Sequence, residues 1–429
     1  MKRFLPILGV VLLVLGMVAS FALDYSQTVK DGAVDFRNRI TGVRLLERGI
    51  DPYHHLWHAG DPEELCDTRN NPRMTVTKTT VSPALLVLYA PLAALPYRGA
   101  EFAWLFAQWL LLLATLGLWL RTGMPSLQLW VAAFFVVGFT FTPGWRWEAE
   151  RGQCYTLLVF LLAYVLAPGR VGGRADDFLV GAMAGVLVAL RPSNIVLLPF
   201  LTMHRPRQFT GALAGLLAAF AAPVLLHAPV WLEYLSAMQA NSDYYRNGTY
   251  PLRPSQPFPP VIEGTPLATM SAMTSYPFVD LSVYAVARRF GCGALPDVPF
   301  VLLFGGLFLA WLFGTRKRQV ELLLPGVAAW IFLSDFVLPT TRWGYYDVMI
   351  LNVILAQIAV ARRIPCAAWP GLLAVPVMWT FSLFEKAPLA LVYAPQILFL
   401  LSAALALLAP FERVPREENA PISGGRVSL

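Results

Sequence analysis

Long apolar runs separated by clusters of Lys and Arg dominate this sequence and restrict the folds open to it. The run at 4–23 holds no charged residue, and about 20 apolar residues suffice for a helix to cross a bilayer. Hydrophobic residues make up 57% of the 429 residues and charged ones only 14%, which is too apolar a balance for a soluble globular protein. The sequence therefore predicts an all-α polytopic membrane protein.

The basic clusters predict an orientation, because short cytoplasmic loops are enriched in Lys and Arg. Placing the clusters inside gives about twelve crossings with both termini cytoplasmic, and this topology, not nucleic acid, accounts for the net charge of +7. The expected spans are 4–23, 101–120, 127–142, 154–167, 178–190, 195–203, 211–226, 300–313, 322–338, 345–361, 369–383 and 389–408.

We expect one integral membrane domain, 1–429, with outer loops at 24–99 and 229–296 and a cytoplasmic tail at 411–429. The apolar stretch 82–97 is short and rich in proline, so it should be interfacial or re-entrant and buried against protein. Residues 275–291 predict a helix on the outer membrane surface or packed on the bundle. The run at 4–23 is longer than most signal-peptide cores, which favours an uncleaved anchor over a cleaved signal.

A polar segment follows the first apolar run directly and predicts an amphipathic helix at the outer face. Its apolar stripe consists of Phe36, Ile40, Val43 and Leu46. The opposite, polar side carries Arg37, Thr41, Arg44 and Arg48. Asp35 lies at the start of this helix, where a carboxylate is either an N-cap for backbone N–H groups or a functional group.

Short motifs follow one another along the chain in a particular order. They are DF at 35–36, LLERGIDPY at 45–53, SPAL and APLAALP within 82–96, GQCYTLL at 152–158, LRP at 190–192 and FLSDFVLPTTRWGYY at 332–346. In this order they resemble glycosyltransferase family 87 of the GT-C superfamily, whose members include polyprenyl-phosphate-mannose-dependent α-mannosyltransferases. The resemblance implies a GT-C-like bundle with juxtamembrane helices at its outer face.

The resemblance also implies a reaction. A sugar, mannose or another hexose or pentose, would pass with inversion from a polyprenyl-phosphate donor to a hydroxyl of a glycolipid, polysaccharide or protein. The reaction would occur at the outer face of a bacterial inner membrane, without a cofactor. Asp35 would be the base that takes the acceptor's proton; Asp24, Asp31 and Asp51 compete for this role.

The leaving phosphate calls for cations at the outer face. Arg191 is the first candidate, because the resemblance and the topology agree on it, and Arg342 and Lys78 follow. The two arginines would otherwise extend to lipid headgroups. The expected acceptor or sugar pocket consists of Glu148, Glu150, Gln153, Tyr345 and Tyr346. Alternatively, the glutamates have structural partners and the tyrosines belong to an interfacial belt. The family often has His after Trp343, where this chain has Gly344.

Other interpretations remain open. His54, His55 and His58 lie near Asp51 and Asp61, but Pro52 argues against a helical zinc site, and we expect no metal. Cys66 and Cys292 are both predicted outside, where they could pair.

Two rival functions also remain. A lipid-linked sugar flippase or transporter would need ionisable residues within the spans, and Asp335 is a candidate for one. A polymerase or ligase of the O-antigen type would use a diphosphate-linked donor.

Overall fold

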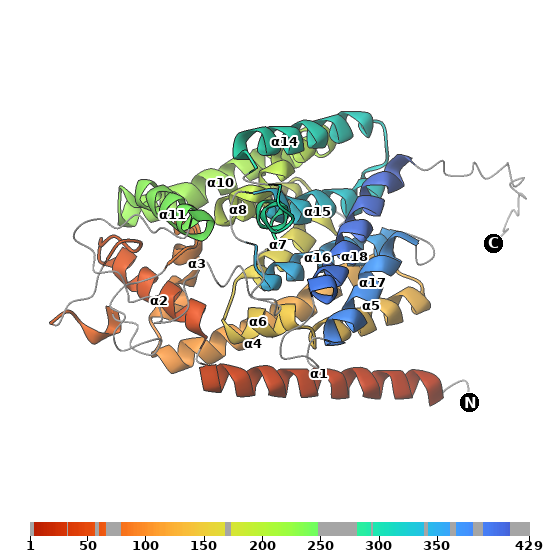
Figure 1. Ribbon diagram of the computed structural model, residues 1–429, viewed down its shortest axis with the longest axis horizontal. Coiled ribbons are helices and arrows are strands. Elements are labelled where there is room, and N and C mark those ends of the chain that lie inside the picture. Colours follow the sequence, from red (N-terminus) through yellow and green to blue (C-terminus); the bar gives the residue numbers. More distant parts are fainter. Residues whose placement is uncertain are drawn as a thin grey trace, which may run out of the picture.

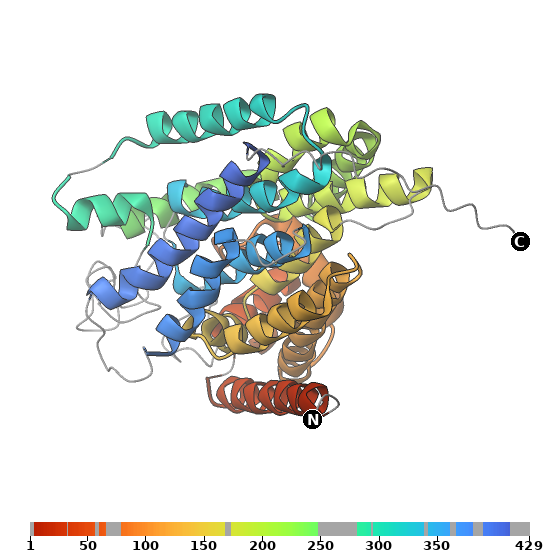
Figure 2. The ribbon, with the colours of Figure 1, turned by 90° about the vertical axis from the view of Figure 1, so that its right-hand side faces the viewer.

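The computed structural model describes residues 4–31, 33–55, 60–65, 79–167, 173–247, 281–292, 295–338, 342–360, 366–380 and 389–411. Within these ranges the chain forms helices and no β-strand. Figures 1 and 2 place α1 (Phe4–Asp31) along one side of the bundle and α14 (Asp297–Gly314) on the opposite side. The all-α membrane fold class is confirmed.

The other helices form the bundle between α1 and α14. They are α2 (Val34–Glu47), α3 (Pro83–Ala93), α4 (Tyr97–Leu120), α5 (Ser126–Phe139), α6 (Pro143–Glu150), α7 (Tyr155–Leu166), α8 (Arg174–Leu190), α9 (Leu197–His204), α10 (Pro206–Leu226), α11 (Val230–Asn247), α13 (Val283–Arg289), α15 (Val320–Val337), α16 (Ile350–Val360), α17 (Trp369–Trp379) and α18 (Leu389–Leu408). The 3-10 turns are η1 (Glu63–Leu65), η2 (Pro192–Val196), η3 (Gly344–Met349), η4 (Cys366–Ala368) and η6 (Ala409–Phe411).

Five helices in the described part of the chain, α1, α4, α10, α14 and α15, are long and apolar enough to cross a membrane. The bent pair α5 and α6 raises this number to six. The apolar helices α3, α7 and α16 are shorter. The 11-residue α3, for example, extends about 16 Å, whereas the hydrocarbon core is about 30 Å thick. The expected number of twelve crossings therefore stays a prediction.

α1 is one uninterrupted helix from Phe4 to Asp31. Ser20 is buried, and its hydroxyl donates to the Thr140 carbonyl oxygen over 3.1 Å. Large apolar side chains elsewhere on α1, such as Ile7 and Val18, are exposed, as suits contact with lipid. The choice of an uncleaved anchor stays a prediction.

α2 forms where the sequence predicts a helix, and its apolar stripe is buried. Arg37 and Thr41, expected on an exposed polar side, are buried as well. The Thr79 hydroxyl donates to the Asn38 carbonyl oxygen over 2.9 Å, and Gly42 packs against Thr79. The prediction of an exposed polar side is therefore wrong for Arg37 and Thr41, and the Arg37 guanidinium lies 5.6 Å from the centroid of the Tyr97 ring of α4.

The two other segments of the outer loops also pack on protein. In α3, Leu85, Leu86 and Tyr89 are buried, so the proline-rich stretch lies against the bundle; whether it re-enters a membrane stays a prediction. In α13, the Tyr284 hydroxyl donates to the Val337 carbonyl oxygen over 2.9 Å, so this helix packs on the bundle. Phe290, directly after α13, is 72% exposed.

α8 and α10 approach each other more closely than side chains would allow. A Cβ atom added at any of four glycines would lie 1.9–2.1 Å from a carbonyl oxygen of the facing helix. These are Gly181 and Gly185 on α8, and Gly211 and Gly215 on α10. Small residues at membrane helix interfaces permit such backbone contact. The seam fixes the position of α8 and so of Arg191 at its end.

The seam predicts that Gly215→Ala destabilises the protein, because the added methyl group would lie 2.1 Å from the Ala182 carbonyl oxygen. Overpacking of this kind costs about 1–3 kcal/mol, so the midpoint of thermal unfolding in detergent should fall. Gly305→Ala in α14 is the control, since no atom lies within 4 Å of its Cβ position. That variant should be neutral or stabilised, given the helix propensity of Ala. Equal midpoints for both variants would contradict the close packing.

Candidate functional site

Most of the expected site residues come together at one end of the bundle, although they come from separate parts of the chain. Asp35 is at the start of α2, Gln153 precedes α7, and Arg191 follows α8. Tyr345 and Tyr346 lie in η3, shortly after α15 ends. In the topology predicted from the basic clusters, each of these positions faces outside.

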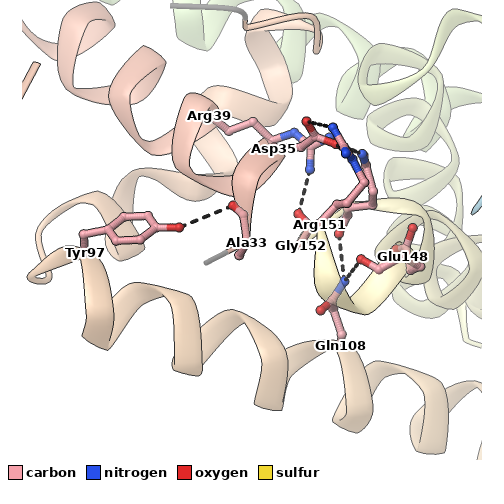
Figure 3. Close-up of polar contacts among 9 residues, drawn as sticks. Ala33, Asp35, Arg39, Tyr97, Gln108, Glu148, Arg151 and Gly152 are labelled. Carbon is pink, nitrogen blue, oxygen red and sulfur yellow. Dashed lines mark hydrogen bonds and ion pairs between the residues drawn. The ribbon is translucent and has the colours of Figure 1, made fainter. Parts of the chain in front are cut away.

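The Asp35 carboxylate is bound by the segment Arg151–Gln153 (Figure 3). Arg151 pairs with it through two hydrogen bonds, Nε to Oδ2 at 2.6 Å and Nη2 to Oδ1 at 2.9 Å. The Gln153 side-chain amide also donates to Oδ2. Burial alone would lower the pKa of the Arg151 guanidinium, but Asp35 more than offsets this and the pKa is raised. The Arg151 guanidinium therefore remains charged.

Asp35 is not the N-cap of α2. The cap position is Ala33, with a left-handed φ of 46°, and no side chain caps the helix there. The backbone N–H groups of Asp35 and Phe36 donate instead to the Arg151 carbonyl oxygen, each over 3.1 Å. Since another segment satisfies these amides, the carboxylate is directed to side chains, and the capping interpretation is wrong.

Arg39, one helical turn after Asp35, orients the group that binds it. Its Nη1 donates to the Gly152 carbonyl oxygen over 2.8 Å, and its Nη2 donates to Oε1 of Gln153. The Gln153 amide nitrogen is thereby directed at Asp35. The sequence analysis missed Arg39, although its i, i+4 spacing from Asp35 places both on one face of the helix.

Two side chains of α4 also bind the segment Arg151–Gln153. The Trp104 indole and the Gln108 amide each donate to the Gln153 carbonyl oxygen over 3.0 Å. Gln108 also donates to the Glu148 carbonyl oxygen over 3.1 Å (Figure 3). The loop between α6 and α7 is thus fixed by α2 on one side and α4 on the other.

Glu148, expected in the acceptor pocket, is fully buried. Its Oε1 accepts from the backbone N–H and the hydroxyl of Thr156, over 2.8 and 3.0 Å. These bonds cap the first turn of α7, which is a structural role. Glu150 lies at the end of α6 and is half-buried.

The Arg191 guanidinium lies between two aromatic rings. The centroids of Tyr155 and Tyr346 are 4.6 and 4.7 Å from its Cζ. Its Nη2 donates to Asp335 Oδ1 over 2.5 Å, and its Nε donates to the Ser193 hydroxyl over 3.0 Å. With 15% of the side chain exposed, this is a cation held in place at the edge of the site rather than one that extends to headgroups.

Arg342 has a different environment from Arg191. It is completely buried, its Nη2 donates to Asp347 Oδ1 over 2.6 Å, and its Cζ lies 3.7 Å from the Phe336 ring centroid. A ligand cannot reach this guanidinium without a rearrangement, so its observed role is structural. Lys78, the third expected cation, lies outside the described residues.

A row of aromatic rings joins Arg151 to Arg191. The Arg151 guanidinium lies 5.1 Å from the Trp147 ring, and Trp147 contacts Tyr345 at 6.0 Å. The ring centroids of Tyr345 and Tyr155 are 5.5 Å apart, and those of Tyr155 and Tyr346 are 4.5 Å apart. Trp147 and Tyr155 were not among the predicted site residues. Their signal in the sequence was their position on either side of the Arg151–Gln153 segment.

The competing carboxylates have partners of their own. Asp24 is buried, and its Oδ2 accepts from the Trp109 and Trp145 indoles over 3.1 and 2.8 Å. Asp51 Oδ2 lies 2.8 Å from the His54 ring nitrogen. Burial alone would raise the pKa of the Asp51 carboxyl, but hydrogen bonds from His54 and the Tyr53 amide outweigh it and the pKa is lowered. Of the side chain of Asp31 nothing is described.

The residues of the metal and disulfide predictions lie only partly within the described ranges. No group of three His, Cys, Asp or Glu residues within the described ranges is arranged to hold a metal ion. His58 and Cys66 lie outside those ranges, and Cys292 is exposed with a free thiol. The pairing of Cys66 with Cys292 therefore stays a prediction.

The left-handed backbone at Gly152, with φ 61°, predicts that Gly152→Ala destabilises the protein. The added Cβ would also lie 2.5 Å from the Phe36 Cβ and displace the start of α2. Gly123→Ala is a matched control, since Gly123 has φ 76° and no atom within 4 Å of its Cβ position. Both variants bear the backbone cost of about 1–2 kcal/mol, so only the Phe36 contact separates them. Thermal unfolding midpoints should fall further for Gly152→Ala, and equal midpoints would contradict the contact.

Residues 80–255 match the family model of glycosyltransferase family 87. The matched range contains Trp147, Arg151, Gln153, Tyr155 and Arg191, and it excludes Asp35 and η3. The resemblance expected from the order of the motifs is thereby confirmed for residues 80–255. No curated protein and no solved structure matches the chain.

Proposed function

From the membership of residues 80–255 in glycosyltransferase family 87, we propose that this glycosyltransferase uses a polyprenyl-phosphate sugar as donor. It transfers the sugar, mannose or another hexose or pentose, to a hydroxyl of a glycolipid, polysaccharide or protein, with inversion at C1. The reaction takes place at the outer face of the bacterial inner membrane. The row of aromatic rings between the Asp35–Arg151 and Arg191–Asp335 pairs is the observation that carries this proposal.

Asp35 acts as the base. An ionised carboxylate offers about four lone-pair positions. In the structure Oδ2 accepts from Arg151 and Gln153, and Oδ1 accepts only the Nη2 donor of Arg151 among the described residues. Oδ1 thus keeps a lone pair for a hydroxyl proton, and 22% of the side chain is exposed. Arg151 and Gln153 hold the carboxylate in one orientation, as general base catalysis requires.

The reaction is a single displacement. The acceptor oxygen forms its bond to C1 of the sugar as the bond from C1 to the phosphate oxygen breaks. The electron pair of that bond leaves with the phosphate, and the acceptor's proton passes to Asp35. Since the leaving group is already a phosphate, its departure needs charge stabilisation rather than a proton.

Arg191 binds the donor phosphate. Its Nε and Nη2 have protein partners, Ser193 and Asp335. Nη1 has no carboxylate partner in the described part of the chain, and we assign it to a phosphate oxygen. Charge-assisted bonds from a guanidinium to phosphate are among the strongest hydrogen bonds in proteins.

The row of aromatic rings binds the sugar between Arg191 and Asp35. The C–H groups on one face of a sugar ring pack against aromatic rings, and phenol hydroxyls can hydrogen-bond the sugar's own hydroxyls. Tyr155, Tyr345 and Tyr346 supply both kinds of contact between Arg191 and Asp35. This arrangement would hold C1 between the phosphate and the base.

The geometry gives less support to the transporter. Asp335, the candidate for a pathway within the spans, pairs with Arg191 at the end of α15. Its role is therefore explained by the site itself.

The proposal predicts that Asp35→Asn lowers the rate of sugar transfer by about 10²–10⁴-fold, the usual contribution of a general base. Purified protein would be supplied with radiolabelled polyprenyl-phosphate sugar and a membrane extract as the acceptor source. Asp51→Asn is the control, because Asp51 forms a local turn with His54 and does not contact the aromatic row. It should retain most of the wild-type rate.

Full activity of Asp35→Asn would exclude Asp35 as the base. Transfer by the wild type from a diphosphate-linked donor, and from no monophosphate donor, would favour the polymerase or ligase instead. Movement of the lipid-linked sugar across vesicles without transfer would favour the flippase.

A further inference from the structure

Two Arg–Asp pairs of similar chemistry lie near the end of α15, and they differ in the donors to their carboxylates and in their exposure. In the Arg342–Asp347 pair both carboxylate oxygens have donors, Arg342 on Oδ1 and Gln396 on Oδ2, each at 2.6 Å. In the Arg191–Asp335 pair only Oδ1 of Asp335 has a donor. Its Oδ2 is buried without a hydrogen-bond partner among the described residues.

Exposure separates the two pairs. Arg342 and Asp347 are both fully buried. The Arg191 side chain is 15% exposed and borders the aromatic row, so a ligand can reach it. The unpaired oxygen of Asp335 costs free energy, and Asp335 bears this cost in the pair that faces the site.

Asp335 controls where the Arg191 guanidinium points. Arg191 has four contacts: Asp335 on Nη2, Ser193 on Nε, and the rings of Tyr155 and Tyr346 on its two sides. The rings fix the plane of the guanidinium but allow it to rotate within that plane. The hydrogen bonds to Asp335 and Ser193 prevent this rotation, so Nη1 keeps a single direction.

We infer that Asp335 is a positioning residue that holds Arg191 ready for the phosphate of a lipid-linked ligand. The inference rests on the proposed function, in which Arg191 binds the donor phosphate. Asp335 does not itself touch the phosphate. Its contribution is to order the guanidinium before the ligand arrives, so that binding loses less side-chain freedom.

Binding of polyprenyl phosphate without a sugar tests this inference apart from catalysis. The full chain would be placed in phosphatidylcholine nanodiscs and titrated with polyprenyl phosphate. For Asp335→Ala we expect the dissociation constant to rise about tenfold, the scale set by ordering one long side chain. Asp335→Asn keeps an oxygen that accepts from Nη2, so it should recover most of the affinity. Polyprenol, which lacks the phosphate, should bind all variants alike.

Two further variants keep the test decisive. Ser193→Ala removes the other hydrogen bond to the Arg191 guanidinium and should raise the same constant by less, even if Asp335→Ala fails to fold. Asp347→Ala breaks the structural pair; it should lower thermal stability and leave the dissociation constant of the folded fraction unchanged.

In transfer assays, Asp335→Ala should raise the donor KM more than it lowers kcat, because the phosphate is charged in both the ground and transition states.

An unchanged dissociation constant in Asp335→Ala would overturn the inference, as would an equal shift for polyprenol or an Asn variant as weak as Ala. A wild type that does not bind polyprenyl phosphate would overturn it as well. If the wild type binds polyprenyl phosphate with the expected order of variants but transfers no sugar, the positioning role stands and the proposed function fails.

Discussion

The rest of the site depends on one junction, where the Arg151 carbonyl oxygen accepts the first amides of α2. The same residue's guanidinium pairs with the Asp35 carboxylate. A single residue thus satisfies the end of the helix and orients the side chain at that end. Gly152 permits the contact, because any larger residue would meet Phe36. The position of Asp35 is therefore set by backbone geometry as well as by charge.

A second constraint comes from the low dielectric of the bundle. Charged side chains within an apolar interior are costly unless they are paired. The described structure meets this cost in several ways: indoles bind Asp24, a backbone amide and a hydroxyl bind Glu148, and arginines bind Asp335 and Asp347. Only the pairs at Asp35 and Arg191 combine such partners with partial exposure and with contact to the aromatic row, which is why we place the chemistry there.

Much of the fold could be predicted from the sequence. Apolar runs and basic clusters predicted the class and most helix positions, and the stripe Phe36–Leu46 predicted α2. The burial of Arg37 could not be predicted, because it depends on packing against the Tyr97 ring of α4, a residue distant in the sequence. The periodicity of apolar residues describes a single helix and contains no information about which segment packs against it.

The sequence predicted which residues belong to the candidate site better than it predicted what each of them does. The motifs identified Asp35, Gln153 and Arg191, but the bond between Asp35 and Arg151 joins residues 116 positions apart. Charge alone also could not distinguish Arg191, which borders the aromatic row, from Arg342, which is enclosed by protein. That distinction requires the burial of each side chain, which only the folded chain provides.

The central claim is that Asp35 and Arg191 mark the two ends of one sugar-transfer site. Cryo-electron microscopy of the chain bound to a non-transferable polyprenyl-phosphate sugar analogue tests it most directly. The account predicts phosphate density within hydrogen-bond distance of the Arg191 guanidinium and a sugar ring against Tyr155, Tyr345 and Tyr346, with C1 facing Asp35. A phosphate bound elsewhere, or a sugar turned away from Asp35, would contradict it.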